Sequence, residues 1–419
     1  MLRQGVLPPR ESIRPEEWVN AMPTDLPAPD DELGVTVDSS ATPYAEDGTA
    51  LVRVGVQARE LTEEDRRPVH MTFVVDTSGS MDIRNRLGLV QSTLALLVDS
   101  LEPTDTVAVV TYSTGSSVLL EPTPVSDGTA IVGAIDELRP HGSTNLAGGL
   151  RDGHALAEQA YDPEADNVVV LASDGVANVG VTGPGSLATM VQERAAQDIH
   201  LATVGYGMGS YNDHQMEQLA DQGDGFYSYV DTFEEAERLF VDDLPELLTI
   251  VAEDAKVQVS FDPALVEEYR LVGYANRALD DAAIDDLTAD AGELGAGASV
   301  TALYELRVAA GVEPGTPVGE VDLRWRSGAD DSQRAAVEAV PAPEAVPPEG
   351  TAAVAALTGT LAELLRGDSV VAARGVTLGD LATDVAPLAE AGVPGAAELA
   401  DTVALATEAR PQAEPFPVE

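Results

Sequence analysis

Two aspartates and three hydroxyl side chains in the first half of the chain have the chemistry of a cation site. Asp76 directly follows the apolar run 73–75, and Ser78 and Ser80 follow it at alternate positions. Asp174 closely follows a second apolar run, 168–171, and Thr144 lies in a polar loop between the two runs. Carboxylate and hydroxyl oxygens are preferred ligands of hard divalent cations. The residue types therefore indicate a metal site built from oxygen ligands.

The elements around these residues predict that they meet at one edge of a sheet. The run 73–75 is typical of a buried strand, and apolar residues spaced three and four apart over 87–101 predict a helix after it. Strand and helix patterns then alternate to about residue 248, which favours a parallel sheet with helices on both faces. Open sheets of this kind bind ligands at the carboxyl ends of their strands. Asp76 and Asp174 are both expected at such ends, where their charges should raise each other's pKa.

The same residues carry a family resemblance. Asp-x-Ser-x-Ser at 76–80, followed by a loop threonine and a strand-end aspartate, resembles the metal-ion-dependent adhesion site of von Willebrand factor type A (VWA) domains. The resemblance implies a doubly wound, mostly parallel sheet and a bound Mg2+, with Mn2+ or Ca2+ as alternatives. In that family some ligands act directly and others through water. The implied ligands here are Asp76, Ser78, Ser80, Thr144 and Asp174.

The resemblance extends over nearly the whole chain. The stretches 16–20, 207–212, 269–277 and 301–305 are similar to a bacterial group of VWA proteins with flanking β-rich and helical regions. Alternating apolar residues on both sides of the metal domain also predict strands that form one β-sandwich-like domain. The predicted organisation is an N-terminal segment (1–30), a discontinuous β-rich domain (31–68 and 252–332), a VWA domain inserted in it (69–250), a linker (333–350) and a helical domain (351–410).

Composition restricts the kinds of partner. The chain has 72 acidic and 23 basic residues and a formal net charge of −49. A field of this sign repels nucleic acid and anionic membrane surfaces, so we expect neither as a partner. The chain has no cysteine, which excludes disulfides and thiolate metal sites. The acidity resembles that of salt-adapted proteins, and a GC-rich genome is the alternative explanation.

The sequence also bears on location. It contains no run of about 18 apolar residues, so no transmembrane helix or direct membrane insertion is expected. The first residues lack the long apolar segment of a signal peptide. The family resemblance nevertheless implies an extracytoplasmic or cell-surface protein.

The function expected from these features is non-enzymatic protein binding. In this interpretation the Mg2+ accepts an acidic side chain from a partner protein, as an adhesion or complex-assembly module would. One alternative is a metal-dependent hydrolase, for which His141 is the candidate general base, although nothing in the sequence orients it. A second alternative is a purely structural metal that joins three loops.

Overall fold

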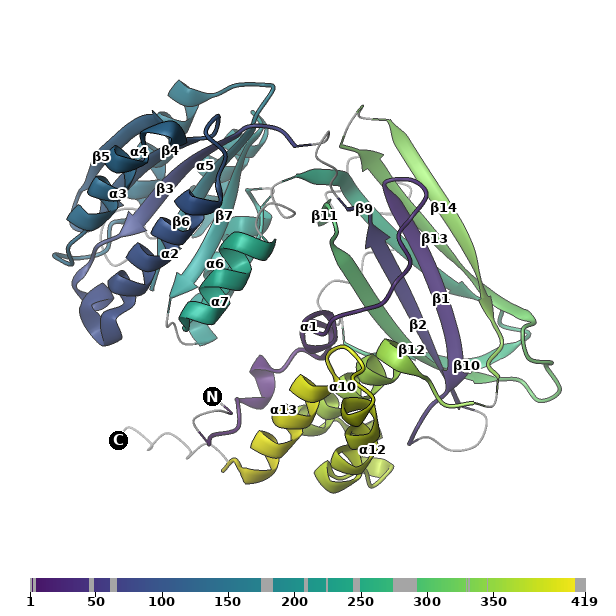
Figure 1. Cartoon of the computed structure of the whole chain (residues 1–419). Helices are drawn as coiled ribbons and strands as arrows, with labels where there is room; N and C mark the ends of the chain where they lie inside the picture. Colours follow the sequence, from purple (N-terminus) through teal and green to yellow (C-terminus); the bar gives the residue numbers. More distant parts are fainter. Residues whose placement is uncertain are drawn as a thin grey trace. The chain divides into compact units, whose positions relative to one another are not determined.

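The computed structural model contains two compact units, shown in Figure 1. One unit is Glu60–Ile250, and the other combines Met1–Arg59 with Val251–Glu419. The second unit is therefore interrupted in the sequence by the first. The residues that the structure describes are 2, 5–44, 49–60, 66–174, 184–206, 210–223, 225–243, 249–273, 292–328, 330, 332–344 and 346–410.

The unit Glu60–Ile250 is built on a six-stranded sheet with the order β5-β4-β3-β6-β7-β8. Every neighbouring pair is parallel except β4 and β5, which are antiparallel. This arrangement confirms the mostly parallel sheet predicted from the sequence. The strands are β3 (Val69–Asp76), β4 (Thr106–Tyr112), β5 (Ser116–Pro124), β6 (Asp166–Ser173), β7 (Ile199–Tyr206) and β8 (Tyr227–Val230).

Helices cover both faces of this sheet because successive side chains of a strand point to opposite faces. On β3, Phe73 and Val75 enter one apolar core, and Val74 enters the other. The first core also receives side chains from α2 (Arg86–Ser100), α3 (Gly128–Glu137) and α7 (Phe233–Glu237). The second receives them from α4 (Leu146–Ala160), α5 (Pro184–Ala195) and α6 (Ser210–Asp221).

Helix α4 lies very close to the central strand β3. A Cβ atom at Gly153 would come within 2.3 Å of the Val74 side chain, so only glycine allows this approach without rearrangement. The residue that caps this helix is Asn145, whose side chain accepts a hydrogen bond from the Gly148 N–H. Such capping fixes the first turn of a helix. The loop residue Thr144, one position before the cap, is therefore held at a defined place above the sheet.

The discontinuous unit contains two four-stranded sheets. One has the order β1-β2-β12-β10 and the other β11-β9-β13-β14. Strands from before and after the inserted unit share a sheet, because β2 pairs with β12 over nine residues, from Thr49 to Gln57. The strands are β1 (Leu33–Ala41), β2 (Thr49–Ala58), β9 (Ile250–Phe261), β10 (Val266–Leu271), β11 (Gly292–Gly295), β12 (Ser299–Val308), β13 (Pro317–Ser327) and β14 (Gln333–Pro341).

The two sheets form a sandwich, because side chains from both enter one apolar cluster, among them Val54 of β2 and Val321 of β13. The C-terminal helices pack against this sandwich and against the N-terminal segment. Helix α1 (Pro15–Asn20) contributes Val19 to an apolar cluster that also contains Leu303 of β12 and Ala356 of α10. Asn20 exchanges two hydrogen bonds with the backbone of Thr301. The C-terminal helices are α10 (Gly350–Arg366), α11 (Ser369–Ala373), α12 (Leu378–Glu390) and α13 (Ala396–Glu408).

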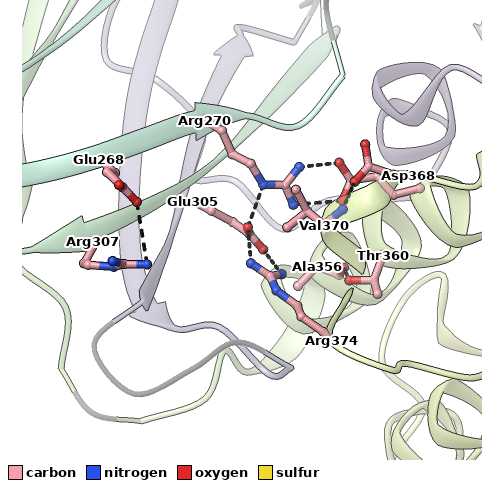
Figure 2. Close-up of polar contacts among 10 residues, drawn as sticks. Glu268, Arg270, Glu305, Arg307, Ala356, Thr360, Asp368, Val370 and Arg374 are labelled. Carbon is pink, nitrogen blue, oxygen red and sulfur yellow. Dashed lines mark hydrogen bonds and ion pairs between the residues drawn. The ribbon is translucent and has the colours of Figure 1, made fainter. Parts of the chain in front are cut away.

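An ion-pair cluster joins the same helices to the sheet (Figure 2). Arg270 on β10 donates to Glu305 on β12 at 2.7 Å and to both carboxylate oxygens of Glu363 on α10 at 2.5 and 3.0 Å. Arg374, just after α11, donates to both oxygens of Glu305 at 2.6 Å. Arginine pairs two carboxylates well because its planar fork offers several donors. The cluster therefore connects two strands with two helices.

The structure corrects the linker expected over 333–350. Residues Gln333–Pro341 form β14, which pairs with β13 in an antiparallel ladder. The sequence missed this strand because most of its side chains are polar or alanine, and Val337 is exposed. An edge strand of this composition buries too little apolar surface to show a strong pattern.

Two stretches that carry part of the family resemblance, 207–209 and 274–277, lie outside the described residues, as does Gly175 after the second aspartate. In the part of the chain that the structure describes, no helix combines the length and apolar character needed to cross a bilayer.

Candidate metal centre

The centre begins at the last residue of β3. Asp76 is fully buried, and each of its carboxylate oxygens accepts a hydrogen bond. The backbone N–H of Ser78 donates to Oδ1 at 2.8 Å, and the hydroxyl of Ser173 donates to Oδ2 at 2.9 Å. The first bond closes a turn at the strand end, and a 3-10 helix, Gly79–Asn85, then leads into α2. The local sequence thus holds this carboxylate in one orientation.

Asp174 approaches the same turn from the neighbouring strand. It follows β6, which runs parallel to β3, so both strand ends lie at the same edge of the sheet. Ser80 donates to Asp174 Oδ1 at 2.9 Å, and the hydroxyl oxygens of Ser78 and Ser80 are 3.0 Å apart. Hydrogen bonds therefore link four of the five residues that the sequence predicts as ligands.

Thr144, the fifth predicted ligand, belongs to a loop that is bonded to the Asp76 turn. The N–H of His141 donates to the Thr77 carbonyl at 2.6 Å, and the N–H of Gly79 donates to the Gly142 carbonyl at 3.1 Å. Thr144 itself is 4% exposed. Three loops, after β3, before α4 and after β6, thus come together at one end of the sheet.

Burial opposes ionisation of the Asp76 carboxyl. Removal from water raises the pKa of the Asp76 carboxyl above its ordinary value, and the negative charge of Asp174 raises it further. Hydrogen bonds from Ser78 and Ser173 act in the opposite direction. The sequence predicted a raised pKa from the like charge alone. In the structure the effect of Asp174 is smaller than that of burial.

A positive side chain that the sequence analysis missed also contacts the cluster. Arg86, the first residue of α2, donates to Asp174 Oδ2 at 2.5 Å. Its side chain is 20% exposed and that of Asp174 is 3% exposed. An arginine ten residues after Asp76 matches no sequence motif. The contact depends on the path of the chain through the 3-10 helix Gly79–Asn85, which the sequence pattern did not predict.

The donor set fits a hard divalent cation. Two buried carboxylates and three hydroxyls offer oxygen ligands without nitrogen or sulfur, as Mg2+ prefers. Among the described residues, no group of three His, Cys, Asp or Glu side chains has the arrangement of a metal site. A cation at this centre would therefore depend on the serine and threonine hydroxyls as well as the aspartates.

His141 does not present its ring to the two aspartates. Its Nδ1 lies 3.0 Å from the carbonyl oxygen of Arg139, and its Nε2 lies 3.2 Å from the hydroxyl of Ser113. These contacts orient the ring, which the sequence did not predict. They are consistent with a proton on Nδ1 and with Nε2 accepting from Ser113. The lone pair that a general base needs therefore points to Ser113, in the loop after β4.

Comparisons with known proteins identify the family of the domain that contains this centre. A family model described as the von Willebrand factor type A domain matches residues 70–242, which hold the parallel sheet and all five predicted ligands. Residues 70–242 are a von Willebrand factor type A domain. Directly after the VWA domain, residues 246–343 match a model described as the C-terminal region of the uncharacterized protein YfbK.

Two curated relatives match parts of this chain. The chain is 37% identical over 314 residues to the uncharacterized protein YfbK of Escherichia coli, covering 73% of this chain and 54% of that protein. It is 28% identical over 189 residues to an uncharacterized protein of Synechocystis sp., covering 45% of this chain and 44% of that protein. The chain thus spans about half the length of these curated relatives.

A solved structure has a similar fold. The protein described as "von Willebrand factor type A from Catenulispora acidiphila" superimposes with a TM-score of 0.50 at 16% identity, covering 88% of this chain and 89% of that one. The similarity supports the fold class of the VWA domain and its flanking regions.

Proposed function

We propose that this chain is a non-enzymatic, Mg2+-dependent protein-binding module. The ion would be held by Asp76, Ser78, Ser80, Thr144 and Asp174. The observation that carries this proposal is the hydrogen-bonded chain through Asp76, Ser78, Ser80 and Asp174 at the carboxyl ends of two parallel strands. A bound Mg2+ would supply a coordination position open to a carboxylate of a partner protein.

The charges of the ligands support binding of an external carboxylate. Asp76 and Asp174 bring two formal negative charges, and the three hydroxyl ligands bring none, so the ligand set does not exceed the charge of the ion. The partner must still approach a chain with a net charge of −49. Salt screens this repulsion, so association with an acidic partner should become faster as ionic strength rises.

The first experiment measures stability against free Mg2+. Ligands from three loops meet only in the folded chain, so the ion should bind the folded state selectively. The free energy of unfolding should then rise as RT ln(1 + [Mg2+]/Kd), about 2.7 kcal/mol at a hundredfold excess over Kd. Thermal and urea unfolding at several Mg2+ concentrations would measure this gain.

Variants locate the ion. Asp76→Ala should abolish the Mg2+-dependent gain without lowering the stability of the metal-free protein, because it removes a buried charge. Thr144→Ala should weaken the gain less, because it removes a neutral ligand. The exposed Asp136→Ala has the same change of charge and should behave as wild type. If Asp76→Ala keeps the full gain, the ion is bound elsewhere.

A pulldown from the source cells separates binding from a structural metal. Wild-type chain in Mg2+ should retain a partner that is lost in chelator and with Asp76→Ala. If Asp76→Ala loses the Mg2+-dependent stability but keeps the partner, the metal only joins the loops. Among the described residues, His141 does not support the hydrolase alternative, because its ring nitrogens contact the Arg139 carbonyl and the Ser113 hydroxyl.

A further inference from the structure

The contact between Arg86 and Asp174 bears on how tightly the centre binds a cation. Asp174 is one of the two carboxylates at the centre, and both of its oxygens are already engaged. Ser80 donates to Oδ1 at 2.9 Å, and the guanidinium of Arg86 donates to Oδ2 at 2.5 Å. A cation that takes Asp174 as a ligand must therefore compete with a positive charge built into the chain.

The two aspartates differ in this respect. Asp76 accepts its hydrogen bonds from neutral donors, the Ser78 N–H and the Ser173 hydroxyl. Asp174 accepts one from a neutral hydroxyl and one from a charged group. Charge-assisted bonds of this kind are about twice as strong as neutral ones. Arg86 thus neutralises one of the two carboxylates when the cation is absent.

The position of Arg86 allows it to leave. It is the first residue of α2 and follows the 3-10 helix Gly79–Asn85 that contains Ser80. Its side chain is 20% exposed, whereas that of Asp174 is 3% exposed. The guanidinium can therefore move toward solvent without unpacking the sheet, while the carboxylate stays in place.

We propose that Arg86 is an internal competitor of the divalent cation for Asp174 and sets the affinity of the centre. This inference rests on the proposed function, since it assumes that a cation binds here. Displacing Arg86 costs part of the binding free energy, so the centre fills only at a higher metal concentration. Metal occupancy is in this way coupled to the position of the first residue of α2.

Calorimetric titration of the full chain with Mg2+, and separately with Mn2+, tests the proposal. Arg86→Gln should bind either metal roughly tenfold more tightly than wild type, because an opposing unit charge a few ångströms away is removed. Arg86→Lys keeps the charge without the planar fork and should fall between the two. Raising ionic strength should change the difference only slightly, because the ion pair is largely buried.

Arg151→Gln is the matched control. It makes the same change of net charge in the VWA domain, but Arg151 pairs with Asp152 and is 69% exposed. Its metal affinity should equal that of wild type. If Arg86→Gln and Arg86→Lys bind metal no more tightly than wild type, Arg86 is not a competitor and the proposal is wrong.

The outcomes also separate this inference from the proposed function. Equal binding by wild type and Arg86→Gln overturns only the role of Arg86. Binding by Arg86→Gln alone supports it strongly. Absence of binding by wild type and both Arg86 variants overturns the metal centre, and the inference with it. Should Arg86→Gln fail to fold by circular dichroism, Arg86→Lys decides the question.

Discussion

One buried polar residue of the VWA domain lies outside the metal centre and opposes folding in acid. His154 on α4 is 1% exposed, and among the described residues neither of its ring nitrogens has a hydrogen-bond partner. Burial, with a smaller contribution from the positive charge of Arg194, lowers the pKa of His154 from 6.5 to about 4. The folded state therefore holds this imidazole in its neutral form at physiological pH.

The shift predicts how stability changes with pH. Because the folded pKa lies below the unfolded one, the unfolded state binds the proton more tightly. His154 therefore does not reduce the free energy of unfolding above pH 6.5. As pH falls from 6.5 to 4, it lowers that free energy by up to about 3 kcal/mol. His154→Leu should abolish this loss and be more stable than wild type at pH 5. The difference between the two urea unfolding free energies, measured from pH 4 to 8, should show this slope. A constant difference would contradict the prediction.

At the same scale, the sequence predicted the acidic part of the centre but not the basic part. Asp76, Ser78 and Ser80 are local in sequence, and Asp174 follows a second apolar run, so strand ends alone bring them near one another. Arg86 contacts a residue 88 positions away. That contact depends on how the 3-10 helix turns into α2, which hydrophobic periodicity does not encode. Which way a long side chain points from a helix start is decided by packing.

Among the elements, an ion-pair cluster connects the sandwich to the C-terminal helices, and Glu305 pairs with both of its arginines. Glu305 on β12 is bonded to Arg270 and Arg374 at once, as Figure 2 shows. Burial works against its ionisation, but the hydrogen bonds from Arg374 and Arg270 outweigh burial and lower the pKa of the Glu305 carboxyl. Its side chain is 9% exposed. Glu305 therefore pairs with both arginines, while Arg270 has a second carboxylate partner in Glu363.

Glu305→Gln should cost about 3 kcal/mol of unfolding free energy, because it leaves two partly buried guanidinium groups without this charge. The neighbouring pair of Glu268 and Arg307 gives the matched control. Its side chains are 71% and 48% exposed, so Glu268→Gln should cost less than about 1 kcal/mol. Urea unfolding measures both values. Limited proteolysis should also cleave the helices α10–α13 sooner in Glu305→Gln. Equal costs for the two variants would show that the cluster adds no stability beyond a surface pair.

The strands could be predicted from the sequence where both of their faces are buried. The parallel strands β3 and β6 contain continuous apolar runs, 73–75 and 168–171, which are typical of buried strands. The strand β14 was missed because its exposed edge leaves alanine, glutamate and arginine where a buried strand would carry branched residues. The start of α12 was also not predicted from the sequence, and there the structure shows a capping box formed by Thr377 and Asp380.

At the scale of the whole molecule, charge should dominate the response to salt. The chain carries 72 acidic against 23 basic residues, so repulsion among carboxylates opposes the compact state. The melting temperature of the metal-free protein should rise with KCl, with most of the increase below about 0.2 M, where the Debye length falls from about 30 to 8 Å. Calorimetry in KCl from 0.01 to about 2 M, in chelator, tests this. A flat or falling melting temperature would favour genome composition as the origin of the acidity.

The insertion of the VWA domain also has a mechanical consequence. The chain leaves the sandwich after β2 and returns through β9. Each of these strands lies between two others, β2 between β1 and β12 and β9 between β11 and β13. The hydrogen bonds of a sheet run across its strands. A force along β2 or β9 would therefore act on many hydrogen bonds of that sheet at once, in shear. Since the two strands belong to different sheets, a pulling force applied to the VWA domain would be divided between both. The VWA domain is thus connected to the sandwich through two central strands, one in each sheet.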